Sequence, residues 1–319
     1  MRSAAARKSG SLWAITSYFN PIGYQRRIQN YHVFRTRLGV PLVTVELSFD
    51  GNFQLGRGDA DILVQLTGRD VLWQKERMLN VASQAIPDKV RDIAWLDCDV
   101  VFATADWAER ASRALDHFAL IQLYDERHNL PCDAALDRLE PLNAVLPTRS
   151  VVHMMVTGEA AAEDFFLADS PLTRRSTCGL AWATRRDLLE DHGLYDACIL
   201  GSADRAILCA ALGRFDHGAK AASMTLRGID HYREWARPYF DSVRGRVGHI
   251  AGRIFHLWHG NLQNRAYGER GRLLHEFHFD PYIDIAIDDN GCWRWNSDKR
   301  AMHEAVRHYF ELRKEDDRE

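Results

Sequence analysis

Apolar runs and amphipathic segments alternate along the first hundred residues of the chain. Short runs typical of buried strands cover residues 12–19, 42–47, 61–66 and 93–96. Between them, residues 24–38 and 73–86 carry apolar side chains at helical spacing, and each segment is followed by a proline. Strands that alternate with helices predict an α/β domain with a largely parallel central sheet.

The rest of the chain is less regular. Residues 118–126 predict a further strand, and residues 180–193 predict a strand or turn that enters a helix ending at Gly193. Residues 202–213 predict a short helix. The last predicted helix, residues 299–316, has an apolar face formed by Met302, Val306, Tyr309 and Leu312.

Composition narrows the class of protein. Hydrophobic residues make up 46% of the 319 positions and charged residues 27%, which is ordinary for a globular protein, and the net charge of −3 gives no sign of a nucleic-acid partner. The six cysteines are scattered without a CxxC pair, which predicts reduced thiols in a cytoplasmic protein. No run approaches the roughly 18 apolar residues of a transmembrane segment.

The first candidate for chemistry is the pair Asp97 and Asp99, which follows the apolar run 93–96. Ligands of open α/β sheets bind beyond the carboxyl ends of strands. Residues two apart in an extended segment point the same way, so both acids are expected to face one divalent cation while Cys98 faces the core. A second DxD, Asp59 to Asp61, precedes its apolar run and predicts only a solvated loop.

Other candidates for ligand contacts lie upstream and downstream of this pair. Lys75, Arg77 and Asn80 sit on the helix before the DxD strand, where they either face solvent or hold a nucleotide base or phosphate. Trp182 lies close to Gly179 and is either a core residue or a surface for a sugar ring.

Three further residues suggest a proton acceptor and metal ligands. Asp204 stands where a helix begins, so it either caps that helix or acts as a general base. His256 and His259 flank a tryptophan and are followed by glycine. One of these imidazoles could complete the coordination of a cation, and imidazole suits Mn²⁺ better than Mg²⁺.

The same pair of acids also fits a phosphatase of the haloacid-dehalogenase type. There Asp97 would be the nucleophile, Asp99 the general acid, and residues 283–289 a second acidic motif after an apolar run. Against this, about 90 residues precede the DxD, and residues 288–291 have the composition of a plain turn.

Taken in order, the segments resemble GT-A-fold glycosyltransferases, close to the family 2-like bacterial and phage enzymes. The resemblance runs from about residue 12 to 280. The segments that carry it are ITSYFNP (15–21), WQKERMLN (73–80), AWLDCDVVF (94–102), GLAWATRRDLLEDHGLYD (179–196), GSADRAI (201–207) and HLWHGNLQNRAY (256–267). Many inverting members carry a second acid before the base, whereas this chain has Ala203.

The small, polar and basic residues 1–10 are expected to be disordered. The resemblance implies one GT-A domain over residues 11–319. Within it, residues 11–105 would bind the nucleotide sugar, 106–298 would bind the acceptor and close the metal site, and 299–319 would form a C-terminal helix and tail. The implied donor contacts are Thr16, Tyr18, Lys75, Arg77, Asn80 and Asp97. The implied ligands of Mn²⁺ or Mg²⁺ are Asp97, Asp99, His256 and His259.

The resemblance further implies transfer of sugar from a nucleoside-diphosphate sugar, with a UDP-sugar expected, to an acceptor hydroxyl. Asp204 would be the base of an inverting displacement, and Trp182 and Gly179 would line the acceptor side. The acceptor stays open. Because Ala203 departs from the pattern, a nucleotide-sugar-binding module without turnover is a further alternative.

Overall fold

The computed structural model describes residues 12–135, 139, 147–161, 164, 175–265 and 270–317. The predicted disordered stretch at residues 1–10 lies outside these residues.

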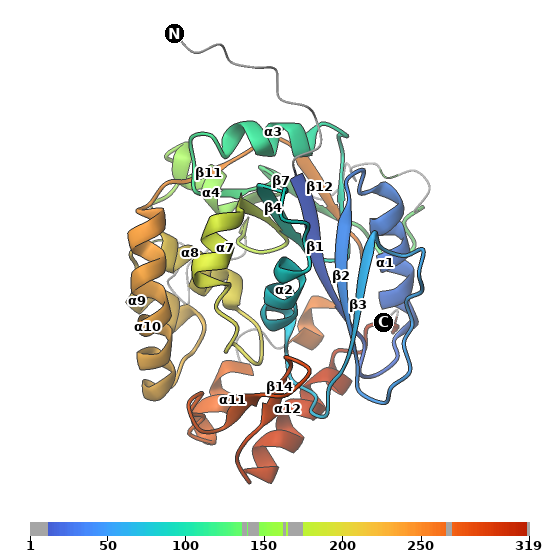
Figure 1. The fold of residues 1–319 in the computed structure, drawn as a ribbon, viewed down its shortest axis with the longest axis vertical. Helices are drawn as coiled ribbons and strands as arrows, with labels where there is room; N and C mark the ends of the chain where they lie inside the picture. Colours follow the sequence, from blue (N-terminus) through green and yellow to red (C-terminus); the bar gives the residue numbers. More distant parts are fainter. Residues whose placement is uncertain are drawn as a thin grey trace.

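A mixed, mostly parallel sheet forms the centre of the molecule (Figure 1). Among the described residues it has seven strands in the order β11-β6-β10-β4-β1-β2-β3. Their bounds are β1 Leu12–Phe19, β2 Leu42–Ser48, β3 Ile62–Thr67, β4 Asp92–Leu96, β6 Leu120–Gln122, β10 Ala181–Arg185 and β11 Val247–His249. β10 runs antiparallel to both of its neighbours, β4 and β6, and the other pairs are parallel. This confirms the predicted α/β class, and strands from both predicted parts of the domain share the one sheet.

Both faces of this sheet are buried, which explains why its central strands are mostly apolar. Along β1, Ile15 and Phe19 belong to one core cluster, whereas Leu12, Ala14 and Tyr18 belong to a second cluster. The alternation of side chains therefore places successive residues in different cores, as expected for parallel strands covered on two sides.

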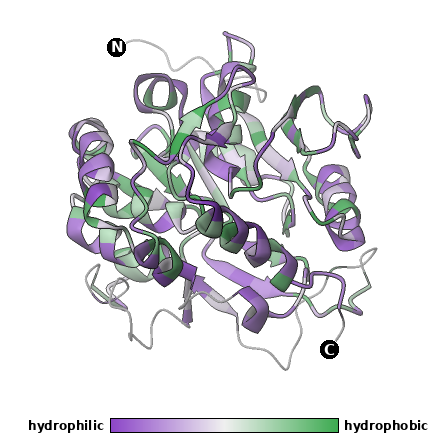
Figure 2. Ribbon diagram, turned by 90° about the horizontal axis from the view of Figure 1, so that it is seen from below, coloured by the Kyte–Doolittle hydropathy of each residue, from purple (hydrophilic) through white to green (hydrophobic). Residues whose placement is uncertain are grey.

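Helices flank the sheet and cover these cores. The helical segments are α1 Gln25–Arg37, α2 Lys75–Gln84, α3 Trp107–Ala114, α4 Val151–Val156, α7 Arg186–His192, α8 Ala203–Ala211, α9 Phe215–Ala221, α10 Leu226–Val243, α11 Arg270–Glu276, α12 Arg300–Leu312 and the 3₁₀ turn Leu262–Arg265. Figure 2 shows peripheral helices with both apolar and hydrophilic residues, as amphipathic helices on a core require. None of the helices in the described ranges combines the length and apolar character of a membrane span.

A second sheet brings the end of β4 beside a segment far along the sequence. Within the described ranges its order is β5-β12-β7-β8-β9, with β5 Val100–Phe102, β7 Glu126–Asn129, β8 Thr148–Ser150, β9 Ser176–Thr177 and β12 Arg253–His256. The predicted single strand at 118–126 is wrong, because the chain leaves the first sheet after β6 and enters the second at β7. Residues 123–125, between β6 and β7, are held by backbone hydrogen bonds: the N–H of Leu123 donates to the carbonyl of Ala181, and the N–H of Asp125 donates to that of Gly252.

The C-terminal part returns to the carboxyl end of β1. There Phe310 of α12 packs against Phe19, with ring centroids 6.2 Å apart. The predicted apolar face of α12 is confirmed for Met302, Val306 and Tyr309, but Leu312 is exposed and Phe310 is buried instead. A separate hairpin, β13 Ile285–Ile287 and β14 Trp293–Trp295, lies at the same end of the molecule (Figure 1).

Candidate metal and donor site

The residues 97–99 form the connection between β4 and β5, and both ends of that connection are anchored. The backbone N–H of Asp97 donates to the carbonyl of Leu180 over 2.8 Å, and the N–H of Leu257 donates to the carbonyl of Asp99 over 2.9 Å. The second bond continues the pairing of β5 with β12. The fold thus places the DxD segment directly against the histidine segment.

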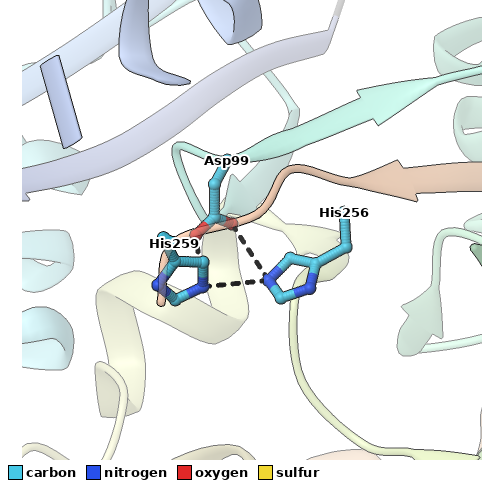
Figure 3. A group of neighbouring side chains, drawn as sticks. All are labelled: Asp99, His256 and His259. Atoms are coloured by element: carbon cyan, nitrogen blue, oxygen red, sulfur yellow. Dashed lines mark hydrogen bonds and ion pairs between the residues drawn. The ribbon is translucent and has the colours of Figure 1, made fainter. Parts of the chain in front are cut away.

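Asp99, His256 and His259 point toward one centre (Figure 3). The Nε2 atoms of the two imidazoles lie 3.2 Å apart. One carboxylate oxygen of Asp99 is 3.1 Å from Nε2 of His259, and the other is 3.6 Å from Nε2 of His256. Within the described parts of the chain, these three form the group of side chains whose geometry could hold a metal ion.

The outer nitrogens of both rings face oxygen atoms. Nδ1 of His256 is 3.1 Å from the amide oxygen of Asn129, and Nδ1 of His259 is 3.9 Å from a carboxylate oxygen of Glu315. An amide oxygen only accepts hydrogen bonds, so a proton on Nδ1 of His256 leaves the lone pair of Nε2 directed at the centre. Histidine ligands of metals in proteins are commonly held in this way.

The electrostatics of the group also fit a cation. Burial lowers the pKa of His256 well below its ordinary value and that of His259 to about 3, so both rings are neutral near pH 7. Burial, followed by the charge of Asp97, raises the pKa of Asp99 to about 7. Moreover, Oδ1 of Asp99 is buried without a hydrogen-bond partner. A buried carboxylate oxygen beside two neutral imidazole nitrogens is a set of atoms that suits a divalent ion such as Mn²⁺.

An arginine that the sequence did not single out reaches the same centre. Nη2 of Arg265, from the 3₁₀ turn, is 2.7 Å from Nε2 of His259. The charges of Arg265 and Arg27 both oppose the rise in the pKa of Asp99. Arg265 lies in segment 256–267, one of the segments that carried the resemblance, so the sequence could have pointed to it. Asn129 and Glu315 had none, because their roles depend on contacts across the fold.

A second cluster surrounds Lys75 at the start of α2. Its Nζ lies 2.8 Å from Asp204, 3.2 Å from Asp97 and 3.3 Å from Glu76. Burial alone would lower the pKa of Lys75, but the three carboxylates raise it well above its ordinary value. Burial raises the pKa of Asp97 and raises that of Glu76 to about 7. One ammonium group thus joins the DxD segment to the candidate base.

The prediction that Asp97 and Asp99 share one cation does not fit this structure. Asp99 turns toward the histidines, whereas Asp97 contacts Lys75. The reason is local: β4 ends at Leu96, and a turn follows in which strand alternation no longer holds. Cys98 packs against the core beside β4, as expected.

Gly179 and Trp182, the two residues predicted on the acceptor side, pack against other parts of the protein. A side chain at Gly179 would place Cβ 2.8 Å from a carboxylate oxygen of Asp204, so glycine makes room for that acid. Trp182 is 2% exposed, donates from Nε1 to the carbonyl of Cys178, and stacks on Trp95. Its predicted role on the acceptor side needs correction, because its ring has no free face.

Two predicted donor contacts on β1 are buried. The hydroxyl of Thr16 is fully covered and donates to the carbonyl of Leu96, which ties β1 to β4. Tyr18 is 2% exposed, and its hydroxyl donates to Gln54. Both side chains face the protein interior, so neither position fits a nucleotide contact.

Two predicted donor contacts on α2 hold a neighbouring loop. Arg77 lies 3.1 Å from a carboxylate oxygen of Asp196, and Asn80 donates to that oxygen and to the carbonyl of Leu194. These contacts fix residues 194–196 after α7. Among the predicted residues of α2, Lys75 is therefore the one that the fold brings to the DxD segment.

The acids of the alternative phosphatase motif form contacts that stabilise the C-terminal hairpin of β13 and β14. Asp284 is buried against Lys299 over 2.8 Å, and Asp288 accepts hydrogen bonds from the backbone of Asn290 and Cys292. They flank β13, in a two-stranded sheet separate from the sheet that contains β4. The structure therefore gives the second phosphatase motif a turn-forming role.

No family model matches the chain, and no curated protein matches its sequence. Similar solved structures include S. aureus TarS 1-349 in complex with UDP-GlcNAc, at 12% identity and a TM-score of 0.38, covering 79% of this chain and 59% of that one. They also include glucosyl-3-phosphoglycerate synthase from Mycobacterium tuberculosis in complex with Mn²⁺, UDP and phosphoglyceric acid, at 11% identity and a TM-score of 0.36, covering 84% and 76%. A third is 4-diphosphocytidyl-2C-methyl-D-erythritol synthase from Anaerococcus prevotii, at 8% identity and a TM-score of 0.33, covering 76% of this chain and 89% of that one.

The chain thus spans 59% of the length of the first of these structures. Likenesses at such identities and TM-scores establish neither a family nor an activity for this chain.

Proposed function

We propose that this protein is a metal-dependent glycosyltransferase that moves a sugar from a nucleoside-diphosphate sugar, with UDP as the expected nucleotide, to an acceptor hydroxyl. The observation that carries the proposal is the convergence of Asp99, His256 and His259 beside the carboxyl end of β4. Ligands of α/β sheets bind at that edge. Two imidazoles and a carboxylate favour Mn²⁺ over Mg²⁺.

The proposed roles follow from the positions of the side chains. Asp99, His256 and His259 would hold the ion, which when bound would stabilise negative charge on the departing diphosphate. Arg265, already 2.7 Å from His259, would donate hydrogen bonds to diphosphate oxygens in the same place. Arg265 thereby adds a positive group on the leaving-group side.

Asp204 is proposed as the base that takes the proton of the acceptor hydroxyl. Lys75 contacts its Oδ2 and orients the carboxylate next to Asp97. Gly179 leaves the space that the carboxylate needs. Attack by the deprotonated hydroxyl on the anomeric carbon, opposite the leaving diphosphate, would invert the configuration of the sugar.

One observation favours a second candidate, a nucleotide-sugar-binding module without turnover. Asp204 lies 2.8 Å from the ammonium of Lys75, and an ion pair of this kind reduces the basicity of a carboxylate. The two candidates share the metal site and differ in whether Asp204 accepts a proton.

The test combines binding and turnover. Titration calorimetry with UDP, with and without Mn²⁺, should show binding that depends on the metal and is lost in Asp99→Asn. Release of UDP from a panel of UDP-sugars should occur with the wild-type protein. In Asp204→Asn, UDP binding should persist while release falls by about 10² to 10⁴-fold, the typical effect of losing a general base.

The outcomes separate the candidates. Metal-dependent UDP binding without any release, for every sugar tested, supports the binding module. UDP binding that neither requires Mn²⁺ nor responds to Asp99→Asn contradicts both.

A further inference from the structure

The five residues that follow α12, Arg313 to Asp317, form a C-terminal tail that passes directly behind the metal site. Glu315 in this tail is fully buried. Its carboxylate accepts hydrogen bonds from Arg27 over 2.6 and 2.8 Å and from Arg313 over 2.5 Å. A carboxylate needs such partners to be buried, and these two guanidinium groups hold it in one place.

The fixed carboxylate of Glu315 faces His259. Its Oε1 lies 3.9 Å from Nδ1 of His259, whose opposite nitrogen, Nε2, faces Asp99 over 3.1 Å. Glu315, the imidazole ring and Asp99 therefore form a line. Across 3.9 Å the carboxylate favours a proton on Nδ1 by its charge, without a direct hydrogen bond, and this tautomer leaves Nε2 free for a metal.

The tail is docked at a second point, the start of α1. The carboxylate of Asp316 accepts the backbone N–H groups of Gln25 and Arg26, over 2.9 and 2.8 Å. The residue at the N-cap of α1, Tyr24, provides no side-chain cap, so the tail supplies the acceptor that this helix end requires. The hydroxyl of Tyr24 also accepts the N–H of Lys314.

The segment after His259 is shaped to receive the tail. Gly260 has φ +87°, and a Cβ there would lie 3.0 Å from Cα of Glu315 and 3.1 Å from the carbonyl oxygens of Arg313 and Lys314. Glycine at this position allows the two backbones to touch. The contact fixes the tail relative to His259.

The tail also reaches the turn that precedes the candidate base. Arg313 donates to the hydroxyl of Tyr309 over 3.2 Å, and Arg270 donates to the same hydroxyl over 3.1 Å. Arg270 in turn donates to the hydroxyl of Ser202 over 2.9 Å, two residues before Asp204. One chain of hydrogen bonds thus extends from the tail to the start of α8.

We propose that Glu315 is a positioning residue for His259, and that docking of the C-terminal tail is required to complete the metal site. This inference rests on the proposed function, because it assumes that His259 binds the ion. It predicts that loosening the tail weakens metal binding although all three ligands are intact.

The experiment measures Mn²⁺ binding to the full chain without nucleotide, from the EPR signal of free Mn²⁺. Glu315→Gln should weaken Mn²⁺ binding by about 10- to 100-fold, the usual effect of removing an outer partner of a ligand. Asp316→Asn, which loosens the tail without touching the buried carboxylate, should weaken it less. The control is Glu311→Gln, which also removes one negative charge, but at an exposed position at the end of α12. This variant should bind Mn²⁺ like the wild type.

Two further measurements separate positioning from folding. Circular dichroism checks that each variant is folded, and Glu315→Asp should recover part of the affinity by restoring the charge. The visible spectrum of the Co²⁺-loaded protein should change in Glu315→Gln, because it reports how the imidazoles meet the ion. If Glu315→Gln does not fold, the Mn²⁺ affinity of Asp316→Asn alone tests whether docking of the tail supports the metal site.

Mn²⁺ binding at wild-type affinity in Asp316→Asn and in folded Glu315→Gln would overturn the inference. If His256→Ala abolishes Mn²⁺ binding at the same time, the metal site of the proposed function stands and only the role of the tail fails. A wild-type protein that binds no Mn²⁺ overturns both.

Discussion

The two acids of one DxD segment lie in contrasting surroundings. Asp99 faces two neutral imidazoles, and one of its oxygens has no hydrogen-bond partner. Asp97 faces the ammonium of Lys75, which also contacts Asp204 and Glu76. In the first cluster a guanidinium, that of Arg265, contacts His259, and Oδ1 of Asp99 has no hydrogen-bond partner. In the second cluster one ammonium contacts all three carboxylates.

This difference indicates which cluster needs an external ion. Acceptors that converge without enough donors favour a metal, because a cation removes their mutual repulsion. Carboxylates around an ammonium are compensated within the protein, and their main effect is to hold segments of the chain together. Asp97 and Asp204 thus belong to an ion cluster centred on Lys75, whereas Asp99 belongs to the proposed metal site.

The largest expected effect comes from removing the internal cation. Lys75→Met leaves three carboxylates near one another without their ammonium, and breaking a buried ion pair in this way costs about 3–5 kcal/mol. Urea denaturation should show this loss, while Lys89→Met, at an exposed position, should stay within about 0.5 kcal/mol of the wild type. Equal stability of the two variants would mean that the Lys75 cluster holds nothing together.

The next effect distinguishes the two acids directly. Mn²⁺ at a hundred times its dissociation constant should stabilise the protein by about 2.7 kcal/mol, because it binds only the folded state. Thermal unfolding with and without Mn²⁺ should show this gain in the wild type and in Asp97→Asn, but not in His256→Ala. A gain lost equally in Asp97→Asn would place Asp97 in the metal site after all.

A smaller effect is a pH dependence that arises in the Lys75 cluster. Burial raises the pKa of Glu76 from 4.5 to about 7, so between these pH values the folded protein keeps a proton that the unfolded chain has lost. Stability from this group therefore falls as the pH rises from 4.5 to 7.

Glu76→Gln should remove that fall and gain at least about 1.4 kcal/mol relative to the wild type across this range, the equivalent of one pKa unit. Urea denaturation at several pH values checks it, with Glu304→Gln as the exposed control. A relative stability that does not change with pH would show that Glu76 is charged in the folded protein.

The smallest effect is expected at the other DxD segment. Asp61 pairs with Arg35 and accepts the N–H of Leu42, and its side chain is 42% exposed. Asp61→Asn should lower the free energy of unfolding by no more than about 1 kcal/mol and leave Mn²⁺ binding unchanged. Loss of Mn²⁺ binding in this variant would mean that the two DxD segments had been assigned the wrong way round.

Much of the fold and part of the site could be predicted from local patterns. Strands were predicted at 12–19, 42–47, 61–66 and 93–96, with helices between them, and the structure has strands and helices there. These predictions were possible because the spacing of apolar residues can be read directly from the sequence and differs between strands and helices. The DxD segment could be located for the same reason, since it follows a buried strand. The histidines at 256 and 259 were recognisable by residue type.

The sequence by itself therefore determined the α/β class and the chemical groups available to the site. Only the tertiary structure decided which of them meet: it turned Asp97 and Asp99 apart, buried Trp182, Thr16 and Tyr18, and placed Asn129 and Glu315 behind the histidines. The physical reason is that side-chain directions in a turn, and contacts between segments far apart in the sequence, such as His256 with Asn129 and His259 with Glu315, depend on how sheets and helices pack and not on local periodicity.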